Sequence, residues 1–287
     1  MGQLADTRIG WENEHLATFL LSRISFVANP ITVADDIGSD FFCTLFESKT
    51  QNGKEQLFPR NSFAIQIKSS EEAIPATNKI QYLDKLELPF FVGVINREHL
   101  RLRIYSGEYV PIIFTKYGLP RELRLSLVSA DVIEDKGYCE VKQDNDLIAT
   151  DALLRLPFIM EICAKDSRDD ILGKAQQLGE LCSRIHKNIS AKTSQEYIFI
   201  LDRPAKAMIM AGSGSATTFR RNFYLRLAEV FYNLEWIYTA QQNSLSAGEM
   251  KEFKVYENCY LDLLNTGADI PQMLKNIYDK LKQKIGQ

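Results

Sequence analysis

A chain of 287 residues, of which 45% are hydrophobic and 25% charged, is long enough to bury a sizeable core, and this excludes disordered and fibrous classes. Its formal net charge of −3 gives no overall basic signature, so a nucleic-acid partner would have to be met by a local patch or with help from another subunit. Five scattered cysteines without CxxC spacing favour a reduced, cytoplasmic setting. The sequence shows neither a signal core nor an apolar run of about 18 residues, so we expect neither export nor a membrane span.

The first elements in chain order are predicted to be a helix and three strands. Residues 9–24 repeat apolar side chains at mostly three- and four-residue spacing, which predicts a helix. Residues 26–33 are apolar but contain a proline, so they predict a short or edge strand. Two further strands are predicted at 40–46 and 63–68, and the turn-forming residues within 47–62 suit a long hairpin loop between them.

A crossover and a buried strand are predicted next. Residues 70–86 are polar with a weak helical pattern and would carry the chain over one face of the sheet. Residues 89–95 form a continuous apolar run, which is typical of a central strand covered on both faces. Residues 100–105 alternate apolar and basic side chains and predict a strand with one exposed side. Residues 110–115 are a candidate strand, and 123–133 either pairs with the sheet or wraps around it.

The character of the chain changes near residue 150. We place a boundary there, between a mixed α/β region at 1–150 and a mainly helical region at 151–287. The most amphipathic segment of the whole chain spans residues 217–239. The expected elements of the second region are helices at 171–188, 217–239, 249–264 and 270–285 and strands at 196–201 and 207–211.

Three polar residues of the paired strands are expected to converge. If 40–46 and 63–69 pair antiparallel, Asp40 lies at the same end of the hairpin as Gln66 and Lys68. Period-two alternation then places Gln66 and Lys68 on one face and the isoleucines beside them on the other. A carboxylate, an amide oxygen and an ammonium that meet in this way suit a metal-dependent phosphodiesterase, in which oxygens hold a hard cation and a lysine positions or polarises water.

The pattern of Asp40 followed by Gln66-x-Lys68 on the next strand resembles the PD-(D/E)XK nuclease superfamily, which has the restriction-endonuclease-like fold. Within that superfamily it is similar to the bacterial restriction and Holliday-junction-resolvase-like branches that carry glutamine in place of the second acid. The resemblance covers roughly residues 8–115. By family habit an upstream helix adds a glutamate, which implies Glu14, with Glu12 as the alternative.

The resemblance implies a mixed sheet flanked by helices, in which Asp40, Gln66 and Glu14 hold Mg²⁺ or Mn²⁺ and Lys68 orients the attacking water. Because an amide oxygen is a weaker ligand than a carboxylate, glutamine at position 66 implies looser metal binding. DNA is the implied substrate, and the layout resembles effectors of bacterial restriction or phage defence. The helical residues 151–287 would then bind a protein partner, sense a trigger or form a homo-oligomer.

Other interpretations of the same residues stay open. Asp40 could be a turn residue that caps a strand, with Asp36 or Asp35 as the ligand instead. Gln66 and Lys68 could form the solvated face of an amphipathic strand. The rival functions are a catalytically silent nuclease-like fold that serves as a binding or assembly subunit, and an interaction protein whose helical half does the work.

Two weaker features lie at the start of the helix predicted at 217–239. The glycine-rich stretch 212–218 could cradle a phosphate at the helix N-terminus, but it lacks the P-loop lysine, and a flexible loop with a threonine cap is the simpler explanation. Arg220 and Arg221 could contact a nucleic-acid backbone, although a solvated helix face is the default for such residues.

Overall fold

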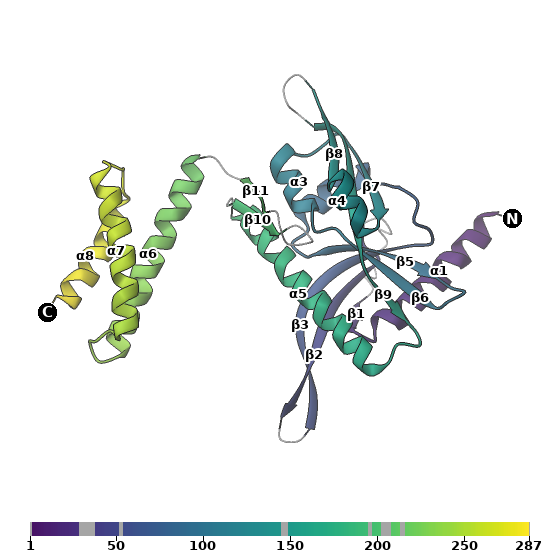
Figure 1. Ribbon diagram of the computed structural model, residues 1–287, viewed down its shortest axis with the longest axis horizontal. Helices are drawn as coiled ribbons and strands as arrows, with labels where there is room; N and C mark the ends of the chain where they lie inside the picture. The colour runs from purple at the N-terminus through teal and green to yellow at the C-terminus, as the bar shows by residue number, and fades with distance from the viewer. Residues whose placement is uncertain are drawn as a thin grey trace. The chain divides into compact units, whose positions relative to one another are not determined.

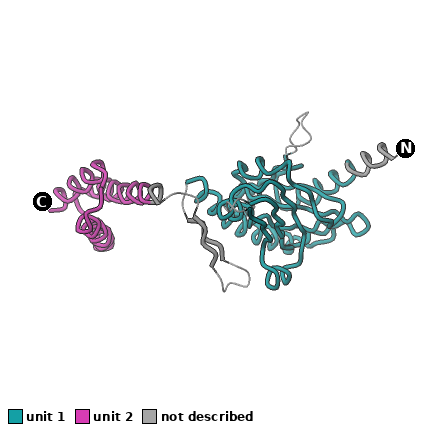
Figure 2. Tube along the Cα trace, turned by 90° about the horizontal axis from the view of Figure 1, so that it is seen from above, with its two compact units in different colours: residues 1–213 teal, residues 214–287 magenta. Residues whose placement is uncertain are grey.

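The computed structural model describes residues 2–28, 38–51, 54–144, 149–194, 197–201, 208–212 and 216–286. The chain divides into two compact units, Met1–Ser213 and Gly214–Gln287 (Figure 2). This division differs from the predicted boundary near residue 150, because the sheet of the first unit continues well past that position.

The first unit contains both strands and helices (Figure 1). In chain order they are α1 (Gly2–Leu21), β1 (Ser25–Ala28), β2 (Phe41–Gln51), β3 (Lys54–Lys68), β4 (Ile74–Pro75), the 3₁₀-helix η1 (Thr77–Lys79), α2 (Ile80–Lys85), β5 (Phe90–Asn96), β6 (Arg101–Ser106), α3 (Val110–Tyr117), β7 (Glu122–Val128), α4 (Ala130–Lys136), β8 (Cys139–Gln143), β9 (Ala149–Cys163), α5 (Arg168–Thr193), β10 (Tyr197–Leu201) and β11 (Met208–Gly212).

Among the described residues, nine strands form one mixed sheet in the order β1-β2-β3-β5-β6-β9-β7-β4, with β8 paired to β9. β1, β2 and β3 form an antiparallel meander, and β5 then lies parallel to β3 after a crossover through η1 and α2. A parallel neighbour requires such a crossover, because a tight turn can only reverse the chain. The prediction of a mixed α/β fold followed by a helical region is confirmed.

Helices cover both faces of this sheet (Figure 1). On one face, α1 and α5 bury residues such as Leu20 and Leu178 against the strands. On the other face, α2 and α3 bury residues such as Leu83 and Ile113. We call these the α1/α5 face and the α2/α3 face. Six of the seven residues of β5 are buried, as predicted for a central strand between two helical layers.

β2 and β3 extend beyond the rest of the sheet as a two-stranded arm (Figure 1). β1 pairs with β2 only as far as Leu45, and β5 pairs with β3 only from Ala64 onward. The prediction of a hairpin loop at 47–62 was therefore wrong, because most of that segment is strand. Pro59 fits in the arm because β3 there has a single strand neighbour among the described residues. The predicted turn at 52–53 lies outside the described residues.

The candidate strand at 110–115 was also a wrong prediction, since this segment is the helix α3. Its residues are nearly all buried, so periodicity could not separate a buried strand from a buried helix. Pro111 in the first turn favours a helix start, because the N–H that proline lacks has no intrahelical partner there. Gly118 ends the helix with a φ of 75°, a conformation that favours glycine.

Strand β9 was missed by the sequence prediction, and it explains why no domain boundary falls near residue 150. Its 15 residues pair with β6, β7 and β8, so it lies in the middle of the sheet. The strand contains a buried charged residue, Arg155, within an otherwise largely apolar segment. The guanidinium of Arg155 donates to the carbonyls of Lys136 and Gly137 at 3.0 and 3.1 Å and pairs with Glu140.

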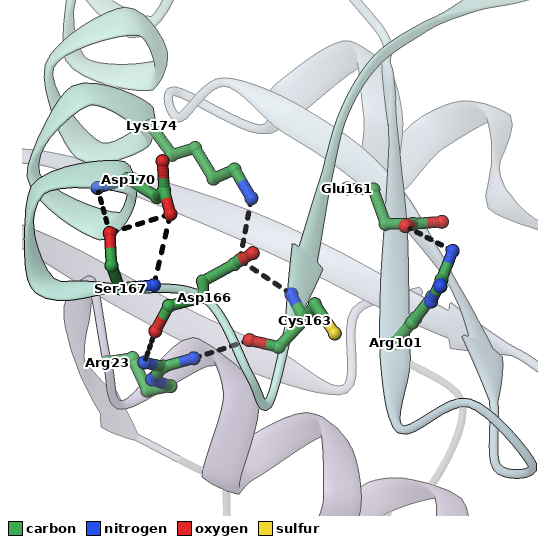
Figure 3. Close-up of polar contacts among 8 residues, drawn as sticks. All are labelled: Arg23, Arg101, Glu161, Cys163, Asp166, Ser167, Asp170 and Lys174. Carbon is green, nitrogen blue, oxygen red and sulfur yellow. Dashed lines mark hydrogen bonds and ion pairs between the residues drawn. The ribbon is translucent and has the colours of Figure 1, made fainter.

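The corner between β9 and α5 is fixed by a network of polar contacts (Figure 3). Asp166 accepts from the backbone N–H of Cys163 at 2.7 Å and from Lys174 Nζ at 2.6 Å. Arg23, just after α1, donates to the carbonyls of Cys163 and Asp166. A capping box of Ser167 then begins α5. These contacts join the end of α1 to the start of α5 on the same face of the sheet.

The second unit contains the helices α6 (Ala216–Ala240), α7 (Ala247–Asn265) and α8 (Gln272–Ile285), as the sequence predicts. Its core is aromatic: the Phe231 ring lies 5.4 to 6.2 Å from the ring centroids of Phe253, Tyr260 and Tyr278. Glu235 of α6 forms ion pairs of 2.8 Å with Lys280 and Lys284 of α8. Within the described residues, no helix has the length and apolar character that crossing a bilayer requires.

The ring cluster predicts a large difference between two phenylalanines of α6. Phe231 is fully buried, whereas Phe223 is 43% exposed. We expect Phe231→Ala to lower the free energy of unfolding of the second unit by about 3–5 kcal/mol, because it opens a cavity between three rings. Phe223→Ala should change it by about 1 kcal/mol or less. Denaturant unfolding followed by circular dichroism measures both, and equal losses would contradict this packing.

Candidate site at the ends of strands β2 and β3

Asp40 lies immediately before β2, opposite the end of β3. Phe41 pairs with Ile65, which places Asp40 across from Gln66. The backbone N–H of Asp40 donates to the carbonyl of Ile65 at 2.9 Å. The Asp40 carboxylate in turn accepts the backbone N–H of Ile67 through Oδ2, at 2.5 Å. The side chain thus continues the ladder where the strand pairing ends, and the predicted antiparallel pairing is confirmed.

The alternation predicted for β3 is also confirmed. Ile65 and Ile67 belong to the core under the α1/α5 face. Gln66 and Lys68 have Val92 and Val94 as their partners on β5, and both valines belong to the core of the α2/α3 face. Because paired residues of neighbouring strands project to the same side, Gln66 and Lys68 share the α2/α3 face.

Gln66 is buried, which separates it from the solvated side chain of an ordinary amphipathic strand. Only 4% of the residue is exposed. Its Oε1 has no hydrogen-bond partner within the part of the chain that the structure describes. A buried carbonyl oxygen without a partner costs about 1–3 kcal/mol, so such an atom calls for an explanation. Lys68, two residues on, is half-buried.

The Asp40 carboxyl has an unusual electrostatic environment. Burial raises its pKa above the ordinary value of 3.8 and outweighs three opposing effects. The Ile67 N–H and the positive charges of Lys68 and Lys79 act in the other direction and lower the pKa. Two ammonium groups therefore lie near this carboxylate, and Lys79, from η1, was not part of the predicted constellation.

Tyr82 of α2 fixes the segment that carries Asp40. Its hydroxyl donates to Ser39 Oγ at 2.8 Å, and Ser39 is buried. Gly38 has a φ of 107°, and a Cβ at this position would lie 2.6 Å from the Tyr82 ring. The turn before β2 thus requires glycine both for its backbone conformation and for its contact with the ring. The sequence prediction missed Tyr82, since nothing in its local pattern relates it to residue 39.

This contact makes Gly38→Ala a sharp test of how the site is positioned. We expect the substitution to lower the free energy of unfolding by about 2–4 kcal/mol, because a positive φ and a clash with Tyr82 both oppose a methyl group. Gly118→Ala is the matched control: its φ is 75° and nothing lies within 4 Å of the added Cβ. Equal losses for the two variants in thermal unfolding would show that the Tyr82 contact contributes nothing.

Glu14 stays a prediction. It is half-buried on α1, a helix that packs on the α1/α5 face, whereas Gln66 and Lys68 lie on the opposite face. The alternative, Glu12, forms an ion pair of 2.8 Å with Arg97, which also donates to Asn13. This contact gives Glu12 a structural role at the turn after β5.

The donor set fits a Mg²⁺ or Mn²⁺ ion that is held largely by water and substrate. Asp40 would supply one carboxylate, and Gln66 Oε1, which has no partner among the described residues, would supply a neutral oxygen from the opposite position of β3. Mg²⁺ usually keeps several waters and is bound through one or two carboxylates together with substrate phosphates. Within the described residues, no group of three or more His, Cys, Asp and Glu side chains is arranged to hold a metal ion.

The remaining sequence candidates lie elsewhere or outside the described part of the chain. Asp35 and Asp36, the alternative ligands, fall in the segment 29–37, which the structure does not describe. Residues 213–215 of the glycine-rich stretch also lie outside the described residues. Arg220 and Arg221 are exposed on α6 of the second unit.

No protein-family model, curated protein or solved structure matches this chain. Its function is therefore inferred from the fold and the site alone.

Proposed function

We propose that the first unit is a metal-dependent nuclease of the PD-(D/E)XK type that hydrolyses phosphodiester bonds in DNA. One observation carries the proposal: Asp40 lies opposite Gln66 in the β2–β3 register, Gln66 Oε1 is buried without a hydrogen-bond partner among the described residues, and Lys68 shares the face of Gln66. An ordinary sheet gains nothing from burying an unpaired amide oxygen at a position opposite a desolvated carboxyl group. A divalent cation would satisfy both groups.

The order of elements supports the same class. A helix precedes three antiparallel strands, and a crossover helix leads to a strand parallel to the third. In the restriction-endonuclease-like fold, the aspartate begins the second core strand and the Glu/Gln-x-Lys motif lies on the third. The position of Asp40 before β2 and of Gln66 and Lys68 on β3 agrees with that arrangement and supports the proposal.

Each residue then has a definite role. Asp40 and Gln66 would hold Mg²⁺ or Mn²⁺, with Glu14 as the candidate third ligand by family resemblance. The bound ion supplies Lewis-acid stabilisation of charge on the phosphate oxygens. Lys68 orients water toward phosphorus and offsets the negative charge that develops there. Ile67 N–H keeps the Asp40 carboxylate in place through its 2.5 Å hydrogen bond.

The helical second unit is proposed to bind a protein partner or a second copy of the chain, as in an effector of bacterial restriction or phage defence. Its exposed aromatic residues favour a role in recognition, since Tyr232 and Trp236 of α6 are 51% and 68% exposed. Aromatic side chains at a surface are enriched where proteins bind one another.

A second candidate function rests on the sparse donor set. Without a cluster of three acids or histidines among the described residues, the same fold would also serve as a silent binding or assembly subunit. In that case the protein would bind nucleic acid or a partner protein without metal-dependent cleavage.

The two functions are separated by one assay. Purified protein is incubated with supercoiled plasmid, linear duplex, single-stranded DNA and RNA in Mg²⁺ or Mn²⁺, with EDTA controls. Metal-dependent cleavage that is lost in a parallel Lys68→Ala preparation supports the nuclease, because a contaminating enzyme would not respond to the substitution. The assembly subunit is favoured if cleavage persists in the variant. It is also favoured if the wild-type protein cleaves none of the substrates.

A further inference from the structure

Lys68 and two arginines of β6 lie on the α2/α3 face of the sheet. Lys68 pairs with Val94 of β5, Val94 pairs with Arg103 of β6, and Arg103 pairs with Glu161 of β9. These residues form one row that crosses four strands and projects to one side. Arg101, two residues before Arg103, projects to the same side one step farther along β6.

This row marks the edge of the apolar core. The preceding row of partners contains Gln66, Val92, Tyr105 and Phe158, and Val92 and Tyr105 are buried. The next row contains Lys68, Arg103 and Glu161, with the buried Val94 still between Lys68 and Arg103. With neighbouring strands about 4.8 Å apart, Lys68 and Arg103 lie about 10 Å from each other along the row.

The guanidinium of Arg103 stacks on two aromatic rings. Its guanidinium carbon lies 4.9 Å from the Phe158 ring centroid and 5.7 Å from that of Tyr105. The two rings contact each other edge to face, at 5.8 Å. Stacking on aromatic rings orients a guanidinium and leaves its N–H groups available at the outer edge.

Both arginines have carboxylates that a phosphate can replace. Arg103 pairs with Glu71, and Arg101 pairs with Glu161 at 3.0 Å (Figure 3). The side chains of the two pairs are 32–45% exposed. An exposed pair of this kind contributes about 0–1 kcal/mol, and a backbone phosphate group offers a guanidinium the same bidentate pair of oxygens with the same single charge.

We propose that Lys68, Arg103 and Arg101 form a strip that binds the phosphate backbone of the nucleic-acid substrate, and that Glu71 occupies the Arg103 phosphate position in the free protein. This inference rests on the proposed nuclease function and names how its substrate is held. The strip contacts the backbone only, so it binds without sequence preference. Glu71 lowers the affinity for nucleic acid and releases Arg103 when a phosphate arrives.

Binding is measured separately from cleavage by fluorescence anisotropy with a labelled DNA duplex in EDTA. We expect Arg103→Gln and Arg101→Gln each to weaken binding about five- to tenfold and to reduce the slope of log K against log[salt] by about 1. Arg124→Gln is the matched control. Arg124 is a comparably exposed arginine paired with Asp151, but it lies on β7, away from this row.

Glu71→Gln has the opposite expected effect. Gln at position 71 keeps an acceptor for the Tyr105 hydroxyl, which bonds Glu71, but removes the charge that competes with phosphate. We expect binding to tighten about two- to fivefold at low salt. Glu72→Gln changes the net charge equally at the neighbouring exposed position and should leave the affinity nearly unchanged.

The outcomes separate this inference from the proposed function. Cleavage with unaltered binding in Arg103→Gln and Arg101→Gln would overturn the strip and leave the nuclease intact. Binding that depends on both arginines in a protein that does not cleave would support the strip and overturn the nuclease. Equal effects of Glu71→Gln and Glu72→Gln would overturn the role of Glu71, since only net charge would then matter. Failure of the wild-type protein to bind any nucleic acid would overturn both proposals.

Discussion

Replacing Lys68 with alanine is expected to lower the single-turnover rate of metal-dependent DNA cleavage by about 100- to 1,000-fold, the usual effect of removing one group that stabilises transition-state charge. Lys68 is half-buried on the face it shares with Gln66, and its charge acts on the Asp40 carboxyl. It is therefore placed to act on water and phosphate at this site. Rates are measured with enzyme in excess over a labelled duplex.

The control for this variant is Lys85→Ala. Lys85 lies on α2, the helix that carries Tyr82, and its side chain is 81% exposed. Its removal should leave the rate within about twofold, because an isolated surface substitution changes little. Equal losses in both variants would mean that the cleavage depends on general positive charge and not on the position of Lys68.

Asp40→Asn is expected to abolish cleavage and to make the folded protein more stable near neutral pH. The activity is lost because asparagine provides only a neutral amide oxygen for the cation. Stability rises because the fold disfavours the charged carboxylate, as its raised pKa indicates. Asparagine can keep the acceptor for the Ile67 N–H, which limits the loss of structure.

The sign of the pH dependence follows from the direction of that shift. The folded pKa of Asp40 lies above its ordinary value of 3.8, so folding favours the protonated form. The stabilisation from Asp40 is present below 3.8 and is lost as the pH rises through the folded pKa. Thermal unfolding of the wild type and Asp40→Asn should therefore diverge across this acidic window, in favour of the variant. A variant that is less stable at neutral pH would contradict the desolvation of Asp40.

Much of the site could be predicted from short-range patterns. The alternation of residues 63–68 and the aspartate before the preceding strand were sufficient to pair β2 with β3 and to place Gln66 and Lys68 on one face. The burial of Gln66 could not be predicted, because it depends on the helical layer above it. Tyr82 and Lys79 come from the crossover after β3, and only the folded chain brings them to Asp40.

The errors in the fold have related causes. Residues 110–114 are all apolar and buried, so this part of the helix shows no alternation of apolar and polar residues that could reveal a helical period. The arm beyond Leu45 is polar and contains Pro59, which are features of loops, yet pairing between β2 and β3 alone holds it as strand. In β9, Arg155 interrupts the apolar pattern of the sequence. A buried arginine is tolerated there because its guanidinium donates to two backbone carbonyls and pairs with Glu140.

The central position of β9 affects how the first unit unfolds. Phe158–Cys163 pair with β6 and Asp151–Pro157 with β7, so one strand joins the half of the sheet that carries Asp40 to the half formed by β4, β7 and β8. Loss of β9 exposes the edge of β6 and the rings beneath Arg103 together. We therefore expect the two halves to unfold as one cooperative unit, so that a proteolytic cut within β9 also destabilises the distant strands β2 and β3.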